Sequence, residues 1–121
     1  MPDVDYRILC RGKDLATNWR NDLPVVSTPV LVWLCEIAAM DELSHSLGVD
    51  IFTVGFSHEC KHVGAWGRGA RLKASASLLD SDGATFSFDC SVYHNSQLLM
   101  KSIHTRKKVV KEKILDELSH T

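Results

Sequence analysis

The sequence lacks most features that mark membrane, secreted and nucleic-acid-binding proteins. No apolar run approaches the roughly 20 residues that a membrane-spanning helix needs. Residues 1–10 (MPDVDYRILC) lack the basic-then-apolar pattern of a secretory signal. The 14 basic and 15 acidic residues nearly cancel, so no net field would attract nucleic acid or an anionic membrane. We therefore expect no nucleic-acid partner and no membrane partner.

The cysteines do not form a pattern typical of metal binding or of a disulfide framework. Four are present, 25, 25 and 30 residues apart, and no two form a Cys-x-x-Cys motif. Without a secretion signal, free thiols in a reducing compartment fit this spacing better than two disulfides. The sequence therefore predicts a cytoplasmic protein. The cysteines are Cys10, Cys35, Cys60 and Cys90.

The chain of 121 residues is long enough for one compact domain and shows no repeat or linker, so we expect a single domain over residues 1–121. Its clearest element is a helix over about residues 29–47. Thr28 is a good N-cap, and Pro29 suits the first helical position. Gly48 follows the last helical residue, where glycine is favoured.

This helix is apolar almost all the way round, and one carboxylate, Glu36, interrupts it. The apolar run VLVWLC precedes Glu36 and IAAM follows it. A surface helix would show a polar stripe, so we expect other elements to wrap the helix and to enclose both Trp33 and Glu36. Burying a carboxylate is costly and tends to raise its pKa. Glu36 is therefore the first candidate for chemistry.

Strands are predicted on both sides of this helix. Alternation of apolar and polar residues, which is typical of a sheet with one buried face, is clearest around Leu72–Leu78 and Phe86–Val92, with Phe86 and Phe88 in the core. Asp82-Gly83 and Asn95-Ser96 have the composition of tight turns. The expected strands cover residues 4–9, 51–62, 71–80, 84–94 and 97–110, and a short amphipathic helix follows at 111–118.

The order of these elements predicts an α+β fold. A strand, one long helix and four antiparallel strands fit a curved antiparallel sheet of about five strands wrapped around a central helix, which is the hotdog arrangement. A cystatin-like fold, or another sheet with one packed helix, has the same order. The order of elements alone does not separate them.

Three motifs carry a more specific signal. The first is DLPVVSTPVL at residues 22–31, with Glu36 eight residues after Thr28. The second runs from Gly55 through His62, seven residues before a glycine, and the third is the His-x-Arg at residues 104–106. In their order and spacing, over about residues 14–110, they resemble the fluoroacetyl-CoA thioesterase-like family of hotdog proteins.

This resemblance implies hydrolysis of an acyl-CoA thioester by Thr28, Glu36 and His62. It also implies that Gly55 lies near the thioester and Arg106 near the acyl group or CoA. CoA enters as part of the substrate, with no cofactor and no metal. Hotdog proteins in general are homodimers with the site at the interface. Because eight helical residues rise about 12 Å, Thr28 and Glu36 cannot touch, and His62 or a second subunit must close the gap.

The sequence also departs from the family. The loop at residues 63–68 lacks the family's prolines, and no phenylalanine lies between Asn18 and Pro24 to form an aromatic lid. We therefore do not expect selectivity for a fluorinated acyl group. The leading hypothesis is a thioesterase acting on a short or compact acyl-CoA. A protein that binds acyl-CoA or another small ligand without hydrolysing it is an alternative.

Simpler interpretations exist for individual residues. Thr28 can be only a helix cap, and His62 a plain exposed histidine. Glu36 can be an acid on a helix whose carboxylate reaches solvent past one edge of the sheet. Arg106 begins the run Arg106-Lys107-Lys108, which is a solvated basic segment by default but also suits the phosphates of CoA. His58, Cys60 and His62 alternate on one face of a strand, so a transition metal held by these three residues is a further alternative.

Overall fold

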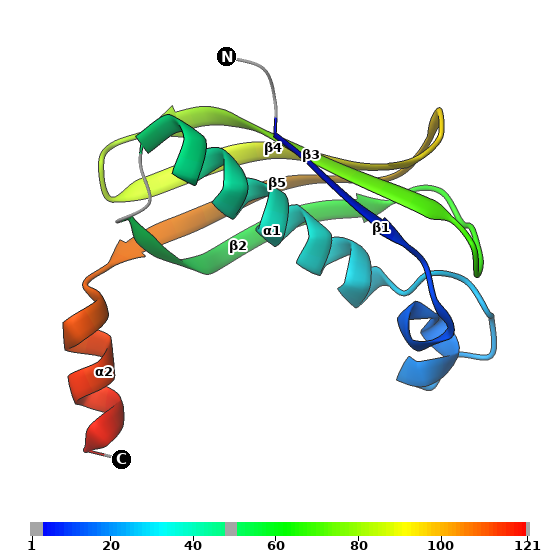
Figure 1. Ribbon diagram of the computed structural model, residues 1–121, viewed down its shortest axis with the longest axis horizontal. Helices are drawn as coiled ribbons and strands as arrows, with labels where there is room; N and C mark the ends of the chain where they lie inside the picture. The colour runs from blue at the N-terminus through cyan, green and yellow to red at the C-terminus, as the bar shows by residue number, and fades with distance from the viewer. Residues whose placement is uncertain (1–3, 48–50, 121) are drawn as a thin grey trace.

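The computed structural model describes residues 4–47 and 51–120, and it contains one curved sheet crossed by one long helix (Figure 1). The order across the sheet is β1-β3-β4-β5-β2, and every neighbouring pair is antiparallel. The predicted hotdog arrangement is confirmed. The strands are β1 (Val4–Leu9), β2 (Phe52–His62), β3 (Arg71–Ser81), β4 (Thr85–His94) and β5 (Gln97–Val109), within a few residues of the expected ranges.

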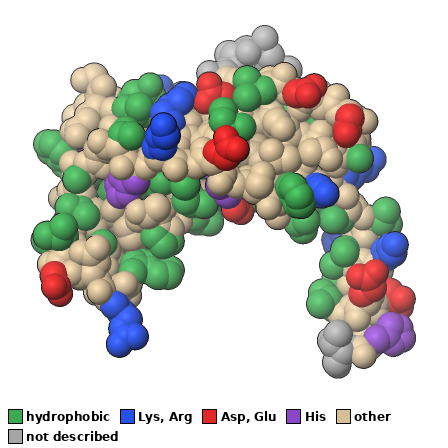
Figure 2. All heavy atoms as spheres, turned by 180° about the vertical axis from the view of Figure 1, so that it is seen from behind, with side chains coloured by type: hydrophobic (Ala, Val, Ile, Leu, Met, Phe, Trp, Pro, Cys, Tyr) green, Lys and Arg blue, Asp and Glu red, His purple; other side chains and the backbone are tan. Residues whose placement is uncertain are grey.

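Two α-helices and two short 3-10 helices complete the described part of the fold. The central helix α1 (Thr28–Leu47) lies across one face of the sheet, and α2 (Lys111–Ser119) extends away from the body beyond the end of β5 (Figures 1 and 2). Two short 3-10 helices, Gly12–Asp14 and Ala16–Trp19, connect β1 to the loop before α1. No helix in the described part of the chain is both long and apolar enough to cross a membrane.

The helix α1 buries only one of its faces. The sheet covers a continuous stripe that includes Leu31, Cys35 and Ala38, all with no exposed surface, and they pack with Phe86 and Phe88 of β4 as predicted. The opposite face is open. Trp33 is 48% exposed there, so the expectation that the helix is wrapped all round, with Trp33 in the core, is wrong. The sheet of this one chain is too narrow to enclose the helix.

The start of α1 differs from the sequence prediction in a way that matters for the site. Ser27, not Thr28, caps the helix: its carbonyl oxygen accepts the N–H of Leu31, and its hydroxyl accepts the N–H of Val30 at 3.4 Å. The hydroxyl of Thr28 is left for another partner. The predicted C-terminal residue, Gly48, lies outside the described residues.

The two predicted tight turns are present. Between β3 and β4 the carboxylate of Asp82 accepts the backbone N–H groups of Ala84 and Thr85, and Gly83 adopts a φ of +89°, which favours glycine. Between β4 and β5, Asn95 adopts a φ of +51°. These turns fix the register of β3, β4 and β5, which form the part of the sheet under α1.

Candidate functional site

The first part of the candidate site is formed where the end of β2 meets the start of α1. One backbone hydrogen bond joins the two segments: the N–H of Val26, before α1, donates to the carbonyl of Trp66, in the loop after β2. The N–H groups of Val63 and Gly64 in the same loop donate to the carbonyl of Leu99 on β5, which anchors the loop to the sheet. A Cβ at Gly64 would lie 2.5 Å from the carbonyl oxygen of Leu98, so this loop requires glycine. The clamped loops hold the last residue of β2 next to Thr28.

Thr28 and His62 form a hydrogen-bonded pair. The hydroxyl oxygen of Thr28 lies 2.7 Å from Nδ1 of His62, and both side chains are exposed. A hydroxyl that donates to an imidazole nitrogen is the arrangement by which a histidine activates a nucleophile. The start of α1 offers few free N–H groups for an oxyanion, because Pro29 has none and the N–H groups of Val30 and Leu31 donate to Ser27.

The second part of the site surrounds Glu36, farther along α1. Its Oε2 lies 3.0 Å from Nε2 of His58, and its Oε1 lies 3.6 Å from the guanidinium of Arg106. The Glu36 side chain is 34% exposed, so it lies at the margin between helix and sheet and is not enclosed as expected. Within this chain its imidazole partner is His58, whereas His62 bonds to Thr28.

Two histidines from neighbouring strands support this second part. His58 on β2 and His104 on β5 are directly paired, and their rings stack with centroids 3.8 Å apart. Nδ1 of His104 donates to the carbonyl oxygen of Ser57 at 2.9 Å, and Nδ1 of His58 lies 3.0 Å from the hydroxyl of Ser102. These contacts fix the orientation of both imidazoles.

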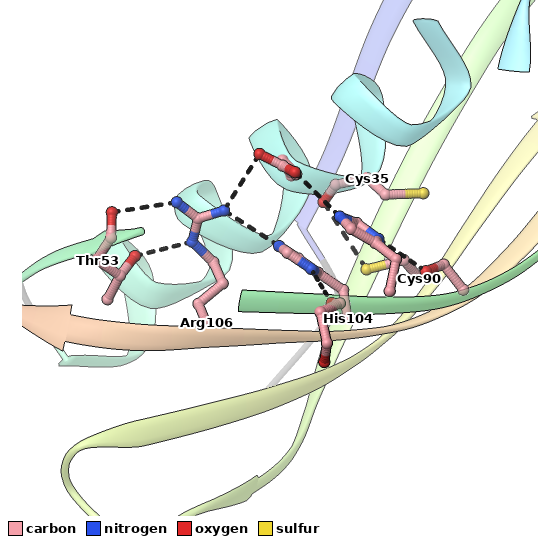
Figure 3. Close-up of polar contacts among 9 residues, drawn as sticks. Cys35, Thr53, Cys90, His104 and Arg106 are labelled. Carbon is pink, nitrogen blue, oxygen red and sulfur yellow. Dashed lines mark hydrogen bonds and ion pairs between the residues drawn. The ribbon is translucent and has the colours of Figure 1, made fainter. Parts of the chain in front are cut away.

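Arg106 is an internal part of this cluster, although the next two residues of the basic run are exposed. It is 3% exposed and is held from two sides (Figure 3). On one side, its Nε donates to the hydroxyl of Thr53 at 2.8 Å, and one terminal nitrogen donates to the carbonyl of Thr53 at 3.1 Å. On the other side, the second terminal nitrogen donates to Nε2 of His104 at 3.1 Å. The interpretation of Arg106 as a solvated residue is therefore wrong.

The charges in this cluster are defined by these contacts. Burial acts to raise the pKa of Glu36, but the hydrogen bond from His58 and the nearby His104 and Arg106 outweigh it, so the pKa is lowered. Burial lowers the pKa of His104 to about 4, against a smaller opposing effect of its bond to Ser57. At neutral pH the cluster therefore holds a carboxylate, a guanidinium and a neutral His104.

Gly55 lies directly against the Glu36 carboxylate. A Cβ built at Gly55 would be 3.2 Å from Oε2 and 3.5 Å from Oε1 of Glu36. A side chain here would push the carboxylate out of its position. In this chain, therefore, Gly55 provides the space in which Glu36 is held.

The cluster also contains metal-ligand residue types. One ligand atom each from Glu36, His58 and His104 lies within 4.8 Å of the others. However, the Arg106 guanidinium already binds Nε2 of His104 and neutralises the carboxylate, so a divalent cation would meet a fixed positive charge. The alternative of a metal on His58, Cys60 and His62 is not supported, because His58 and His62 are engaged with different partners.

Four contributing residues were not predicted as site residues. His104 belongs to the His-x-Arg motif, and its spacing of two from Arg106 places both on one face of β5. His58 shares its strand face with His62, and this alternation by itself suggests only a metal ligand. Thr53 and Ser102 carry no sequence signal, because a single hydroxyl residue in a strand is unremarkable on its own.

Two of three comparisons with known proteins give matches, one to a protein family and one to solved structures. The family described as fluoroacetyl-CoA-specific thioesterase matches residues 11–113. A search of curated proteins gives no match. The solved structure of the fluoroacetyl-CoA thioesterase FlK superposes with a TM-score of 0.85 at 16% identity, over 99% of this chain and 94% of that chain.

Two further solved structures share the fold. A Thermus thermophilus hypothetical protein of the thioesterase superfamily gives a TM-score of 0.86 at 15% identity, over 98% of this chain and 89% of that one. A Bacillus halodurans protein solved with CoA gives a TM-score of 0.75 at 16% identity, over 88% of this chain and 68% of that chain. At these identities the superpositions establish the hotdog fold.

Proposed function

Because the chain belongs to the family of fluoroacetyl-CoA-specific thioesterases, we propose that Thr28, His62 and Glu36 carry the hydrolysis of a short or compact acyl-CoA. The chain is an acyl-CoA thioesterase by its family. The observation that carries the assignment of the site is the 2.7 Å hydrogen bond between Thr28 and His62, which a helix cap does not require because Ser27 caps α1.

The proposed reaction has two steps. His62 takes the proton of the Thr28 hydroxyl as its oxygen attacks the thioester carbon, and the thiolate of CoA leaves with that proton. Glu36, which is ionised at neutral pH, then takes a proton from water as the water oxygen attacks the carbonyl carbon of the threonine ester. The bond from that carbon to the Thr28 oxygen breaks, and the proton held by Glu36 passes to this oxygen, so both side chains return to their starting state. The products are the free acid and CoA. CoA is part of the substrate, and the reaction needs no cofactor and no metal.

The two parts of the site come from two subunits in the homodimer we propose. β2 is a long edge strand paired only with β5, and its other edge is free in the described chain. It exposes Phe52, Val54 and Phe56, as an interface strand would. Antiparallel pairing of two β2 edges across a two-fold axis would bring the His62 end of one strand beside the Gly55 end of the other.

In such a dimer, Thr28 and His62 would face the partner subunit's Glu36. This removes the difficulty that Thr28 and Glu36 lie eight residues apart on one helix.

Lys108 follows Arg106 by two residues on β5 and so shares its strand face. We propose that this exposed lysine meets the phosphates of CoA while Arg106 lies nearer the acyl group. A cytoplasmic location, and the absence of nucleic-acid and membrane partners, complete the proposal.

The test is release of free CoA thiol from a panel of acyl-CoAs of increasing acyl size. We expect the shortest acyl groups to be the best substrates. Thr28→Val, His62→Gln and Glu36→Gln should each lower kcat about a hundredfold or more, with an unchanged Tm. Glu112→Gln on the projecting helix α2 is the matched control and should keep full activity.

Mass spectrometry of the Glu36→Gln variant tests the two-step route. This variant should retain an acyl group on Thr28, because its second step lacks a base. Hydrolysis that continues at the normal rate in Thr28→Val or Glu36→Gln would contradict the assigned roles. Thermal stabilisation by CoA without thiol release would instead indicate a binding protein.

A further inference from the structure

Two imidazoles in the site, those of His58 and His104, have no part in the proposed reaction, and His58 is the one bonded to Glu36. His58 lies between Ser102 on β5 and Glu36 on α1, with Nδ1 3.0 Å from the Ser102 hydroxyl and Nε2 3.0 Å from Oε2 of Glu36. Ser102 is 2% exposed, and the side chain of His58 is 16% exposed. The three side chains thus form a continuous hydrogen-bonded line that ends at the candidate base.

We propose that His58 is a positioning residue for Glu36: Ser102 fixes its tautomer, and its Nε2–H holds the carboxylate, ionised, in one orientation against Gly55. This inference rests on the proposed function only in taking Glu36 as a base. His58 does not touch the substrate in this role. It acts on the rate through Glu36.

The hydrogen-bond donors explain why this role belongs to His58. In its neutral form an imidazole has one N–H. An ionised carboxylate can only accept, so in the neutral ring the proton lies on Nε2, facing Glu36, and Nδ1 is the acceptor for the Ser102 hydroxyl 3.0 Å away. His104 cannot substitute, since it donates to the carbonyl of Ser57. Arg106 lies 3.6 Å from Glu36, beyond hydrogen-bond distance. Among the described residues, His58 makes the one hydrogen bond to this carboxylate.

The ring of His58 also has a fixed plane. It stacks on His104 with an angle of 8° between the rings. Stacking and the Ser102 bond together restrict rotation of His58, so the donor is already aimed at Glu36 before any substrate binds. Such preorganisation counts in catalysis, because a displacement of about 1 Å can cost about a hundredfold in rate.

Two substitutions separate the donor from the ring. His58→Phe keeps a flat ring that can stack on His104 but has no N–H. His58→Gln loses the ring but keeps an amide donor at the position of Nε2. We expect His58→Phe to lower kcat about ten- to a hundredfold with KM unchanged, and His58→Gln to retain most of the activity. His120→Phe, on the exposed end of α2, is the control for the substitution itself.

The pH profile gives a readout that a purely structural role would not change. Glu36 faces His58 from β2 and His104 and Arg106 from β5, and His58 supplies the largest of the effects that lower its pKa. Without that donor the pKa of Glu36 should rise, so the acid limb of kcat/KM should move to higher pH in His58→Phe. It should stay in place in His58→Gln.

Carbon-13 NMR of the Glu36 carboxyl group measures the same shift without any substrate. A higher Glu36 pKa in His58→Phe and an unchanged one in His58→Gln would support the inference even if another residue proved to be the base. Equal pKa values in wild type and His58→Phe would overturn it. If His58→Phe does not fold, Ser102→Ala takes its place: a shift in the same direction supports the inference, and no shift contradicts it.

Discussion

Glu36 is positioned by backbone space as much as by side-chain contacts. Its carboxylate lies over Gly55, next to the donor of His58 and the charge of Arg106. An apolar helix that carries one acid predicts a fully buried carboxylate with a raised pKa. The structure has a half-buried carboxylate whose pKa is lowered, because hydrogen bonding and nearby positive groups outweigh burial.

The contact between Gly55 and Glu36 predicts that adding a single methyl group at residue 55 lowers activity. In Gly55→Ala the new Cβ would lie 3.2 Å from Oε2, so the carboxylate must move by a few tenths of an ångström. We expect kcat to fall about tenfold, since the base is displaced. The Tm of the protein should change little, because residue 55 is exposed. Steady-state kinetics and thermal unfolding measure both quantities.

The matched control is Gly12→Ala. A Cβ at Gly12 would meet its nearest neighbour, Arg68, at 3.9 Å, an ordinary van der Waals distance. This variant should keep the kcat of the wild type. An equal loss of rate in both variants would argue against a specific contact between residue 55 and Glu36.

At the start of α1, two neighbouring hydroxyl side chains have different roles, one in stability and one in the proposed catalysis. Ser27 is buried and caps the helix, and exposed Thr28 bonds His62. Removing a cap costs about 0.5–2 kcal/mol of stability. We therefore expect Ser27→Ala to lower the free energy of unfolding by about 1 kcal/mol with little change in kcat.

The complementary variant at the same helix start should behave in the opposite way. Thr28→Val keeps the shape of the side chain and removes only the hydroxyl, so kcat should fall about a hundredfold or more and stability should stay within about 0.5 kcal/mol. Urea unfolding and thiol release separate the two effects. These different roles are refuted if Thr28→Val lowers the free energy of unfolding and Ser27→Ala lowers kcat.

The strand β2 shows why the sequence predicted the elements better than the site. Strict alternation would put Gly55 and His58, three residues apart, on opposite faces. The pairing of β2 with β5 shifts between Gly55 and Ser57, leaving Phe56 as an extra residue. This bulge turns both Gly55 and His58 toward Glu36. A glycine within a strand, such as Gly55, is a common sign of a bulge, but it does not show which neighbouring residue is the extra one. The bond between His58 and Glu36 therefore could not be predicted.

The helix and strand bounds were predictable because local patterns determine them. The proline after Thr28 marked the start of α1 within one residue, and alternation marked β3 and β4. Burial was less predictable. The apolar outer face of α1, with Trp33 and Met40 exposed, depends on how far the sheet extends, which is a property of the whole chain. Only the family resemblance marked Arg106 as a site residue, because a run of basic residues by itself predicts side chains exposed to solvent.

For the whole molecule, the separation of the two parts of the site has a direct consequence. Thr28 bonds His62 at one end of β2, and Glu36 lies against Gly55 nearer its other end. If one complete site combines the first part of one subunit with the second part of its partner, inactive variants of different parts should complement each other. Variants of the same part should not.

Mixing Thr28→Val with Glu36→Gln subunits and allowing them to exchange tests this. Half of the dimers should then be mixed, and each mixed dimer has one intact site of two, so about a quarter of the wild-type activity should return. Thr28→Val mixed with His62→Gln is the control, because both changes affect the same part and every site stays defective. Thiol release from the first mixture no faster than from the control would contradict a site shared between two subunits.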